Sequence, residues 1–196
     1  MAYPDSPSRD GPPGGQPATL TALLRSRAVE QADALAYAFL ADGETVRDRF
    51  TYAELDRQAR QIAGLLRNHG AIGKPVLLLY PPGLDYIAAF FGCVYAGAIA
   101  APAYPPHRNR SLDRLLSIIR DAGARTVLCT NAVRESIDRA ANEAPELRTL
   151  DWLATNEPRI LEVEPFCDET VTPERVAFLQ YTSGSTSTPR GVILSH

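Results

Sequence analysis

The chain has 196 residues, of which 45% are hydrophobic and 22% are charged, and its formal net charge at pH 7 is −3. This is the composition of a soluble globular protein, and it excludes a nucleic-acid binder that works through a broad basic face. The three cysteines, Cys93, Cys129 and Cys167, are too far apart for a disulfide framework or a zinc-ligand spacing. We therefore expect buried, reduced thiols in a cytoplasmic protein.

The N-terminal segment, residues 1–17, is rich in proline and glycine and has few apolar side chains. This composition predicts a disordered tail, and no basic segment followed by an apolar one indicates a signal peptide. After the tail, Thr19 is placed to cap a helix with one apolar face. Residues 34–41 and 46–50 flank Asp42-Gly43, a pattern typical of a hairpin of two short strands.

A second helix is predicted from the capping box of Thr51 and Glu54 to Gly70. We expect its basic side chains to form a solvated face: Arg57, Arg60 and Arg67. The unbroken apolar run 76–80 that follows is typical of a parallel strand covered on both faces.

Residues 86–106 carry no charge, and this stretch is long enough to span a membrane as a helix. Glycines and prolines interrupt this stretch, so we interpret it as a buried helix, 84–95, followed by a buried strand, 98–103, and not as a membrane span. With strand 76–80, these elements form a strand–helix–strand unit of a parallel sheet.

The alternation of strands and helices continues to the end of the chain. Ser111 is predicted to cap a helix, residues 125–130 form a strand, and Asn131 begins a helix that ends near Pro145. Further strands are expected at 147–152, 176–181 and 192–194. The predicted fold class is α/β, a mainly parallel sheet flanked by helices.

The segment that follows strand 176–181 is the strongest candidate for a site. Every residue from Thr182 to Thr188 is glycine or carries a hydroxyl, and Pro189, Arg190 and Gly191 follow. Small residues let the backbone approach an anion, while hydroxyls, amides and a guanidinium donate to its oxygens. Because ligands of such sheets bind beyond the carboxyl ends of the strands, this loop is predicted to hold phosphate.

Two familiar phosphate motifs do not fit this loop. The Walker pattern requires Gly-Lys followed by Ser or Thr, but the next glycine after Gly184 is Gly191, which lies between Arg190 and Val192. A dinucleotide fingerprint requires Gly-x-Gly-x-x-Gly at the start of a helix, and no such pattern is present.

The run Tyr-Thr-Ser-Gly-Ser-Thr-x-x-Pro-Arg-Gly-Val at residues 181–192 resembles the phosphate loop of the adenylate-forming superfamily. That superfamily includes acyl-CoA synthetases, nonribosomal adenylation domains, luciferases and fatty acyl-AMP ligases. Its members usually have glycine at the position of Ser187 and lysine at the position of Arg190. Serine restricts the backbone more than glycine does, and arginine keeps the charge but changes its geometry.

Residues 78–106, which run from Leu-Leu-Tyr-Pro-Pro-Gly-Leu-Asp to Ala-Pro-Ala-Tyr-Pro-Pro, resemble the fatty acyl-AMP ligase branch in particular. Gln180 and Ser187 are also similar to that branch. The resemblance covers residues 19–196. It implies that residues 18–196 are the N-terminal portion of a large AMP-binding domain, with the fold incomplete and the small C-terminal domain absent.

The resemblance implies a two-step acyl transfer with ATP and Mg²⁺. A long-chain fatty acid attacks the α-phosphorus of ATP, pyrophosphate leaves, and the acyl-AMP passes to the phosphopantetheine thiol of an acyl carrier protein. Donors around the β- and γ-phosphates favour this departure. The expected catalytic residue is Arg190, and the expected nucleotide-binding residues are Thr182, Ser183, Gly184, Ser185, Thr186, Ser187, Arg190 and Gly191.

Other functions stay open from the sequence alone. The chain could belong to an acyl-CoA ligase or an amino-acid adenylation domain, or be a non-catalytic module that binds nucleotide or a partner. The resemblance also implies that these residues alone are inactive, because the later motifs of the superfamily are missing. His196 is expected to cap or pack near a following helix, and His69 and His107 have less claim to a role.

Overall fold

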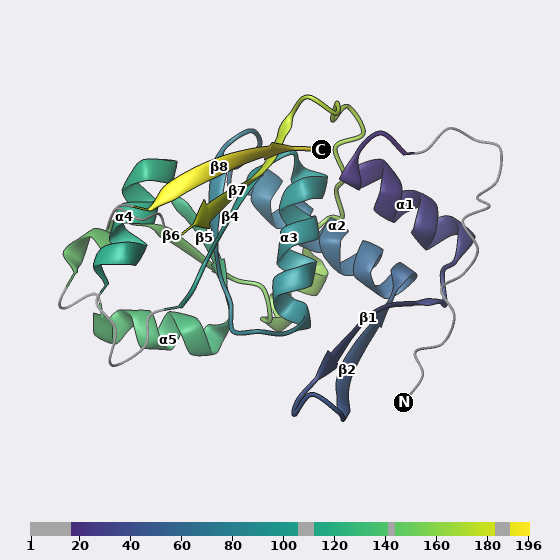
Figure 1. Ribbon diagram of the computed structural model, residues 1–196, viewed down its shortest axis with the longest axis horizontal. Helices are drawn as coiled ribbons and strands as arrows, with labels where there is room; N and C mark the ends of the chain where they lie inside the picture. The colour runs from purple at the N-terminus through teal and green to yellow at the C-terminus, as the bar shows by residue number, and fades with distance from the viewer. Residues whose placement is uncertain (1–16, 106–111, 141–143, 183–188) are drawn as a thin grey trace.

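The computed structural model describes residues 17–105, 112–140, 144–182 and 189–196, which form an α/β fold. Figure 1 shows a central sheet with helices on both faces and a separate hairpin that projects from it. The expected fold class, a mainly parallel sheet flanked by helices, is confirmed.

The central sheet has six strands in the order β6-β5-β3-β4-β7-β8. The first five run parallel, and β8 is antiparallel to β7. Their bounds are β3 Pro75–Leu79, β4 Ile99–Ala103, β5 Thr126–Cys129, β6 Asp151–Ala154, β7 Val176–Thr182 and β8 Arg190–Ser195. The carboxyl ends of the five parallel strands therefore lie at one edge of the sheet, where ligands of such sheets bind.

The apolar residues of β3 show why this strand is central. Val76 and Leu78 pack into one hydrophobic cluster with α2 (Tyr52–Asn68) and α3 (Leu84–Ala96). Leu77 and Leu79 pack into a second cluster on the opposite face. Because side chains alternate along a strand, an unbroken apolar run satisfies both faces.

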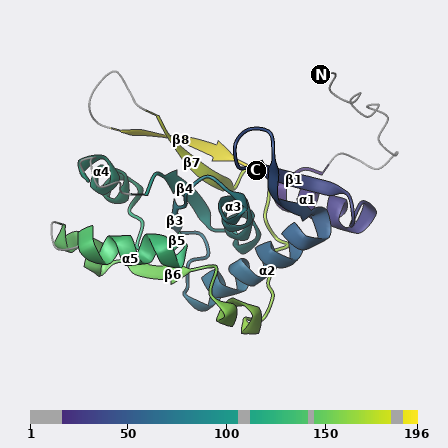
Figure 2. The same ribbon diagram turned by 90° about the horizontal axis from the view of Figure 1, so that it is seen from below.

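Two helices cover each of the broad faces. Figure 2 shows α2 and α3 on one side of the sheet and α4 (Asp113–Ala122) and α5 (Asn131–Ala140) on the other. The expected strand–helix–strand unit is present as β3, α3 and β4, and its two strands pair in parallel. Among the described residues, no helix has the length and apolar character needed to cross a membrane.

The N-terminal elements follow their local signals. Thr19 caps α1 (Leu20–Glu30) by accepting a hydrogen bond from the amide of Ala22. Thr51 and Glu54 form the predicted capping box at the start of α2. The predicted hairpin is present as β1 (Leu35–Leu40) and β2 (Val46–Thr51).

Two features of the region after α5 differ from the sequence prediction. The predicted strand 147–152 is wrong in its first part, because Pro145–Thr149 form a 3₁₀ helix, η1, and β6 begins only at Asp151. Leu147 is buried, and its carbonyl accepts a 2.8 Å hydrogen bond from the indole Nε1 of Trp152, so the turn is stabilised by packing. Pro145 stands at the start of this turn, where its missing N–H costs nothing.

The helix predicted from Asn131 to near Pro145 is described only as far as Ala140, and residues 141–143 lie outside the described residues. The predicted cap Ser111, the tail 1–16 and His107 also lie outside them. The N-cap residue of α4 is Leu112, which makes no side-chain capping bond.

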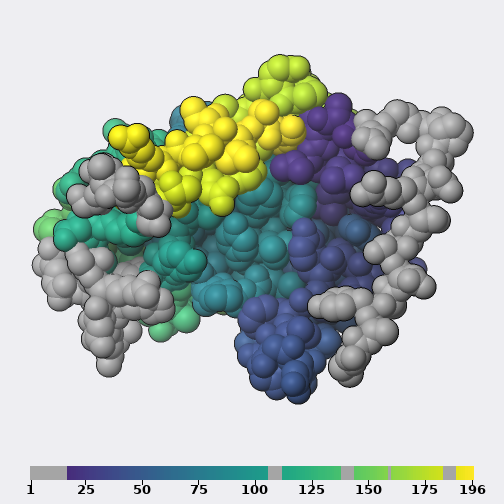
Figure 3. All heavy atoms as spheres, in the orientation of Figure 1, coloured from purple at the N-terminus to yellow at the C-terminus, as the bar shows by residue number. Residues whose placement is uncertain are grey.

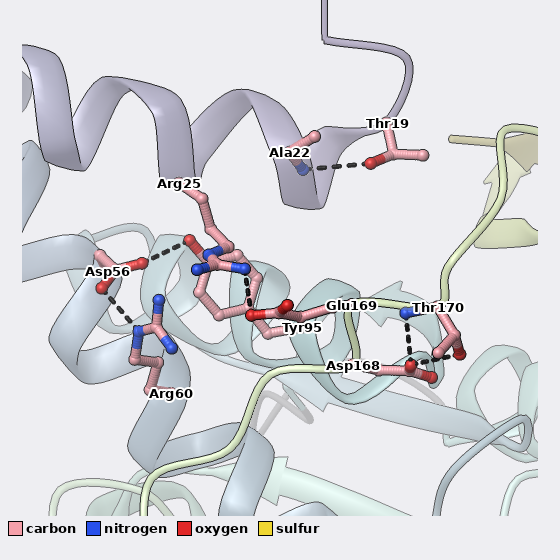
Figure 4. A network of polar contacts seen from close by, with 9 residues as sticks. All are labelled: Thr19, Ala22, Arg25, Asp56, Arg60, Tyr95, Asp168, Glu169 and Thr170. Atoms are coloured by element: carbon pink, nitrogen blue, oxygen red, sulfur yellow. Dashed lines mark hydrogen bonds and ion pairs between the residues drawn. The ribbon is translucent and has the colours of Figure 1, made fainter.

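Residues 163–175, which we call the strap, connect the second 3₁₀ helix, η2 (Pro158–Glu162), to β7. The strap lies across α2 and α3: the amide of Phe166 donates to the carbonyl of Arg60, and the amide of Asp168 donates to that of Tyr95. Figure 4 shows the polar contacts around it.

The strap changes the expected solvated face of α2. Arg57 is exposed, but Arg60 pairs with Asp56 at 2.7 Å, and the Arg67 guanidinium lies 4.7 Å from the centre of the Phe166 ring. The predicted solvated arginine face therefore holds for Arg57, whereas Arg60 and Arg67 are only partly exposed. The covering segment comes from about 100 residues later in the chain, so no local pattern could predict it.

Candidate functional site

The described residues that flank the predicted phosphate loop belong to β7 and β8 or adjoin them. The last pair of the hairpin is Thr182 opposite Arg190, followed inward by Tyr181 opposite Gly191. Of the predicted site residues, the structure therefore places Thr182, Arg190 and Gly191 together. The remaining five lie outside the described residues: Ser183, Gly184, Ser185, Thr186 and Ser187.

The two faces of the hairpin have different roles. Phe178 packs into the cluster of α2 and α3, whereas Leu179 and Tyr181 pack into the cluster of α4 and α5. By the alternation of side chains along a strand, Thr182 and Arg190 lie on the face opposite to Tyr181.

Arg190 is available for an external ligand. Its side chain is exposed, and it makes no ion pair with any residue that the structure describes. Thr182 is also exposed and provides a hydroxyl on the opposing strand. A guanidinium and a hydroxyl at one end of a hairpin can both donate to the oxygens of a phosphate group, so the chemistry of these two residues suits a phosphate-bearing ligand.

Gly191 allows a close approach between the two strands of the hairpin. A Cβ atom at this position would be 3.1 Å from Cζ of Tyr181 and 3.3 Å from its hydroxyl oxygen. Pro189, beside Arg190, is buried. The backbone on this side of the loop is therefore held closely against the rest of the hairpin.

The sequence analysis missed one contact at this site. The hydroxyl of Tyr181 donates a 2.7 Å hydrogen bond to Oδ2 of Asp121 in the last turn of α4. Burial and this hydrogen bond raise the pKa of Tyr181, so it stays protonated and a donor at neutral pH. Asp121 and Tyr181 are 60 residues apart, and no sequence signal joins them.

His196 follows β8 directly, and no helix after it is described, so its expected packing near a following helix stays a prediction. It is partly buried, its ring nitrogens have no hydrogen-bond partner among the described residues, and its amide donates to the carbonyl of Arg175. Burial, with a smaller effect of the Arg175 charge, lowers the pKa of its imidazole. His69 is exposed, and its Nδ1 lies 2.9 Å from the carbonyl of Leu65 at the end of α2.

The thiols are buried, as predicted for Cys93 and Cys129, while Cys167 in the strap is partly buried. All three are free, and burial raises the pKa of each one. Within the described ranges, no group of three His, Cys, Asp or Glu residues could hold a metal ion.

A pocket of about 360 Å³ lies near the β6 edge of the sheet, between α2 and the turn that follows β6. It is lined by Arg57, Gln61, Asp85 and Asn156, among others. Strands β5, β3 and β4 separate β6 from β7, so this pocket does not include the candidate phosphate-binding residues.

The sequence pattern of a known family, described as AMP-binding enzyme, matches residues 24–196. The chain belongs to this family. The match includes all the described elements of the central sheet and the hairpin that holds Thr182 and Arg190.

Two curated relatives in this family are fatty-acid ligases. JamA of Moorena producens (strain JHB), a medium-chain-fatty-acid–[acyl-carrier-protein] ligase, is 38% identical over 182 residues, which are 91% of this chain and 31% of JamA. FadD23 of Mycobacterium tuberculosis (strain CDC 1551 / Oshkosh), a long-chain-fatty-acid–AMP ligase, is 30% identical over 184 residues, with the same coverages. The chain thus spans about a third of the length of these relatives.

Solved structures give the same picture of the fold. A fatty acyl-adenylate ligase from L. pneumophila, crystallised with acyl adenylate and pyrophosphate, matches with a TM-score of 0.76 at 35% identity. This match covers 92% of the present chain and 31% of that one. The McyG A-PCP structure matches with a TM-score of 0.76 at 23% identity, which supports the shared fold alone.

Proposed function

We propose that the protein activates a long-chain fatty acid with ATP, forming acyl-AMP and pyrophosphate, and passes the acyl group to an acyl carrier protein. The observation that carries this proposal is the exposed pair of Thr182 and Arg190 at the end of the β7–β8 hairpin, in a chain that belongs to the AMP-binding enzyme family. The fatty-acid ligases among its relatives support the substrate class.

The role of Arg190 follows from the charge that develops in the first step. When the carboxylate attacks the α-phosphorus, the bond to the bridging oxygen breaks and negative charge grows on the leaving pyrophosphate. A guanidinium held at the β- and γ-phosphates stabilises that charge, and the Thr182 hydroxyl adds a donor from the facing strand. Mg²⁺, when bound with ATP, neutralises phosphate charge; no residue of this chain is assigned to hold it.

Residues 183–188 belong to this proposal through the family resemblance. Ser183, Gly184, Ser185, Thr186 and Ser187 would supply further hydroxyl and amide donors between Thr182 and Arg190. Gly191 would act indirectly, by allowing the close approach of Tyr181 that the structure contains.

The direct test is ATP–pyrophosphate exchange that depends on added fatty acid. The assay should use both the 196-residue chain and the full product of its gene, because the chain spans about a third of its relatives. We expect exchange with the full product and none with the 196 residues alone. Arg190→Ala should reduce exchange by about 10²- to 10³-fold, as loss of a donor to developing charge does in other enzymes.

A matched control is Arg49→Ala, which removes an exposed arginine from strand β2, far along the chain from the hairpin. It should leave the exchange rate unchanged. Equal rates for the wild type and Arg190→Ala would remove Arg190 from its proposed role.

An acyl-CoA ligase is the second candidate function. One relative, FadD21 of Mycobacterium leprae (strain TN), is named a putative fatty-acid–CoA ligase and is 35% identical over 185 residues. The two candidates differ in the acceptor of the acyl group. Supplying free coenzyme A and a phosphopantetheinylated carrier protein in parallel, with detection of each thioester, decides between them.

A further inference from the structure

We propose that Tyr181 is a positioning residue for Arg190, and that Asp121 on α4 holds Tyr181 in place for this purpose. The proposal rests on the proposed function, because it concerns how the phosphate-binding end of the hairpin is held. It assigns a role to a residue pair outside the set predicted from the sequence.

The backbone pairing between β7 and its neighbour β4 is short. In the described part of the chain, β7 pairs with β4 only through Phe178 and Ala100. The β7–β8 pairing, by contrast, continues for four further residues, to Thr182 opposite Arg190. The outer part of the hairpin therefore continues beyond its pairing with β4, and side-chain contacts contribute to holding it in place.

The Tyr181 hydrogen bond supplies such a contact. Tyr181 lies in this outer part of β7, and its hydroxyl is 2.7 Å from Oδ2 of Asp121. A hydrogen bond to a carboxylate is stronger than one between neutral groups. Because α4 packs on the body of the fold through Leu115 and Ile118, the bond ties the outer hairpin to a fixed helix.

The contact with Gly191 transfers this constraint to β8. The ring of Tyr181 lies so close to Gly191 that a Cβ atom there would be 3.1 to 3.3 Å from three of its atoms. Gly191 is the neighbour of Arg190 along β8. A ring that is bonded through its hydroxyl and lies close to Gly191 therefore limits the movement of the backbone that carries the Arg190 side chain.

The residue that supports the hairpin and the residues proposed to bind phosphate lie on opposite faces of it. Tyr181 occupies the α4 face, and alternation places Arg190 and Thr182 on the other one. The carboxylate of Asp121 is bonded to Tyr181, and Arg190 makes no ion pair with it. The guanidinium thus stays available for a phosphate group.

The test uses the 196-residue chain with inorganic pyrophosphate and Mg²⁺ as the probe, followed by NMR signals of the Arg190 side chain and the Gly191 amide. We expect saturable binding by the wild type. Tyr181→Phe keeps the ring on Gly191 but removes the hydroxyl, and Asp121→Ala removes the acceptor. Each should weaken pyrophosphate binding by about two- to tenfold, the range for one hydrogen bond.

Two further variants separate positioning from general stability. The double variant Tyr181→Phe, Asp121→Ala should bind no more weakly than either single one, because both remove the same bond. Asp121→Asn keeps an oxygen acceptor and should restore most of the affinity. Tyr37→Phe, in the β1–β2 hairpin, is the matched control and should leave binding unchanged.

The outcomes distinguish a failure of the proposed function from a failure of the positioning role of Tyr181. Absence of pyrophosphate binding by the wild type, together with absence of exchange by the full gene product, would overturn the proposed function. Binding by the wild type that is equally strong in Tyr181→Phe would overturn only the positioning role. Additive losses in the double variant would likewise show that Tyr181 and Asp121 do not act through one bond.

Discussion

The hydroxyl of Tyr95 on α3 donates a 2.7 Å hydrogen bond to Oδ1 of Asp56 on α2. The second oxygen of the same carboxylate accepts a 2.7 Å bond from Nε of Arg60 (Figure 4). Tyr95 is fully buried, and the Arg60 guanidinium lies 5.8 Å from the centre of its ring. The backbone carbonyl of Tyr95 also accepts from Asp168 in the strap, so α2, α3 and the strap meet at this residue.

Tyr95→Phe is predicted to lower the free energy of unfolding by about 1 to 3 kcal/mol. The substitution removes a hydrogen bond to a charged acceptor that is only 17% exposed, and water cannot fully replace the lost donor. Urea denaturation measures the effect. The control is Tyr104→Phe, whose side chain is 75% exposed and which should change stability by less than about 0.5 kcal/mol. Equal effects of the two substitutions would contradict the prediction.

Gly92→Ala is predicted to destabilise the packing of α3 on α2. A Cβ atom at Gly92 would be 2.4 Å from Cγ2 of Ile62, far inside van der Waals contact. Overpacking of this kind costs about 1 to 3 kcal/mol, more than the gain of about 1 kcal/mol in helix propensity. Thermal or urea unfolding would measure the net loss.

The control for this clash is the same substitution in an Ile62→Ala background. Ile62→Ala removes the Cγ2 atom but keeps Cβ, which would lie 2.6 Å from the added atom, so Gly92→Ala should cost less there than in the wild type but still destabilise the protein. An identical cost in both backgrounds would mean that Cγ2 of Ile62 is not the obstacle.

The turn of the β1–β2 hairpin is predicted to weaken in strong acid. The Asp42 carboxylate accepts hydrogen bonds from the amides of Thr45 and Glu44 and from the Thr45 hydroxyl, and these lower its pKa to about 2. Because the pKa of Asp42 is lower in the folded state, its ionised carboxylate stabilises the fold at pH values above the ordinary carboxyl pKa near 3.9. This contribution is lost as the pH falls towards 2. An NMR titration of the carboxyl carbon should have its midpoint near 2.

Amide exchange of Thr45 provides a second measurement of the same turn. Asp42→Ala should accelerate this exchange, because the Thr45 amide then loses the carboxylate that accepts its hydrogen bond. Glu44→Ala, which leaves all three bonds to Asp42 in place, should not. A normal titration midpoint for Asp42 would contradict the assigned hydrogen bonds.

The thiols are predicted to react slowly in the folded protein. Burial raises the pKa of Cys129 to about 11 and that of Cys167 to about 11, and it raises the pKa of Cys93 as well. At pH 8 the thiolate fraction is then lower by roughly two orders of magnitude than for a thiol of pKa 8.5. A disulfide reagent should therefore label the urea-unfolded chain far faster than the native one, and Cys167 should react first in the native state.

The same shifts predict a loss of stability in alkali. A thiol whose pKa is raised by folding contributes stability in full below the unfolded value near 8.5, and this stability declines as the pH rises towards 11. Cys129→Ala should remove the part of the pH-dependent loss of unfolding free energy that ionisation of Cys129 causes. Unfolding free energies at pH 7.5, 9 and 10.5 would measure it, and a pH-independent difference between the two proteins would contradict the prediction.

The sequence by itself determined the features that depend on near neighbours. Thr19 and Thr51 cap their helices through bonds to residues three positions away, and Asp42 forms its turn in the same way. The apolar run of β3 indicated a strand covered on both faces, since only such a strand has no polar side. The hydroxyl-rich segment and its flanking residues identified the candidate phosphate loop, because the chemistry of phosphate binding needs those residue types in one short run.

Only the tertiary structure decided the contacts between distant segments. The strand order, the bond between Tyr181 and Asp121, and the strap across α2 all join residues tens of positions apart. Residues 147–149, predicted as strand, belong instead to the turn Pro145–Thr149, where Leu147 is buried and its carbonyl accepts a bond from Trp152. Such contacts depend on which surfaces pack together. The periodicity of a helix or strand shows that one of its surfaces is apolar, but it does not show which other surface packs against it.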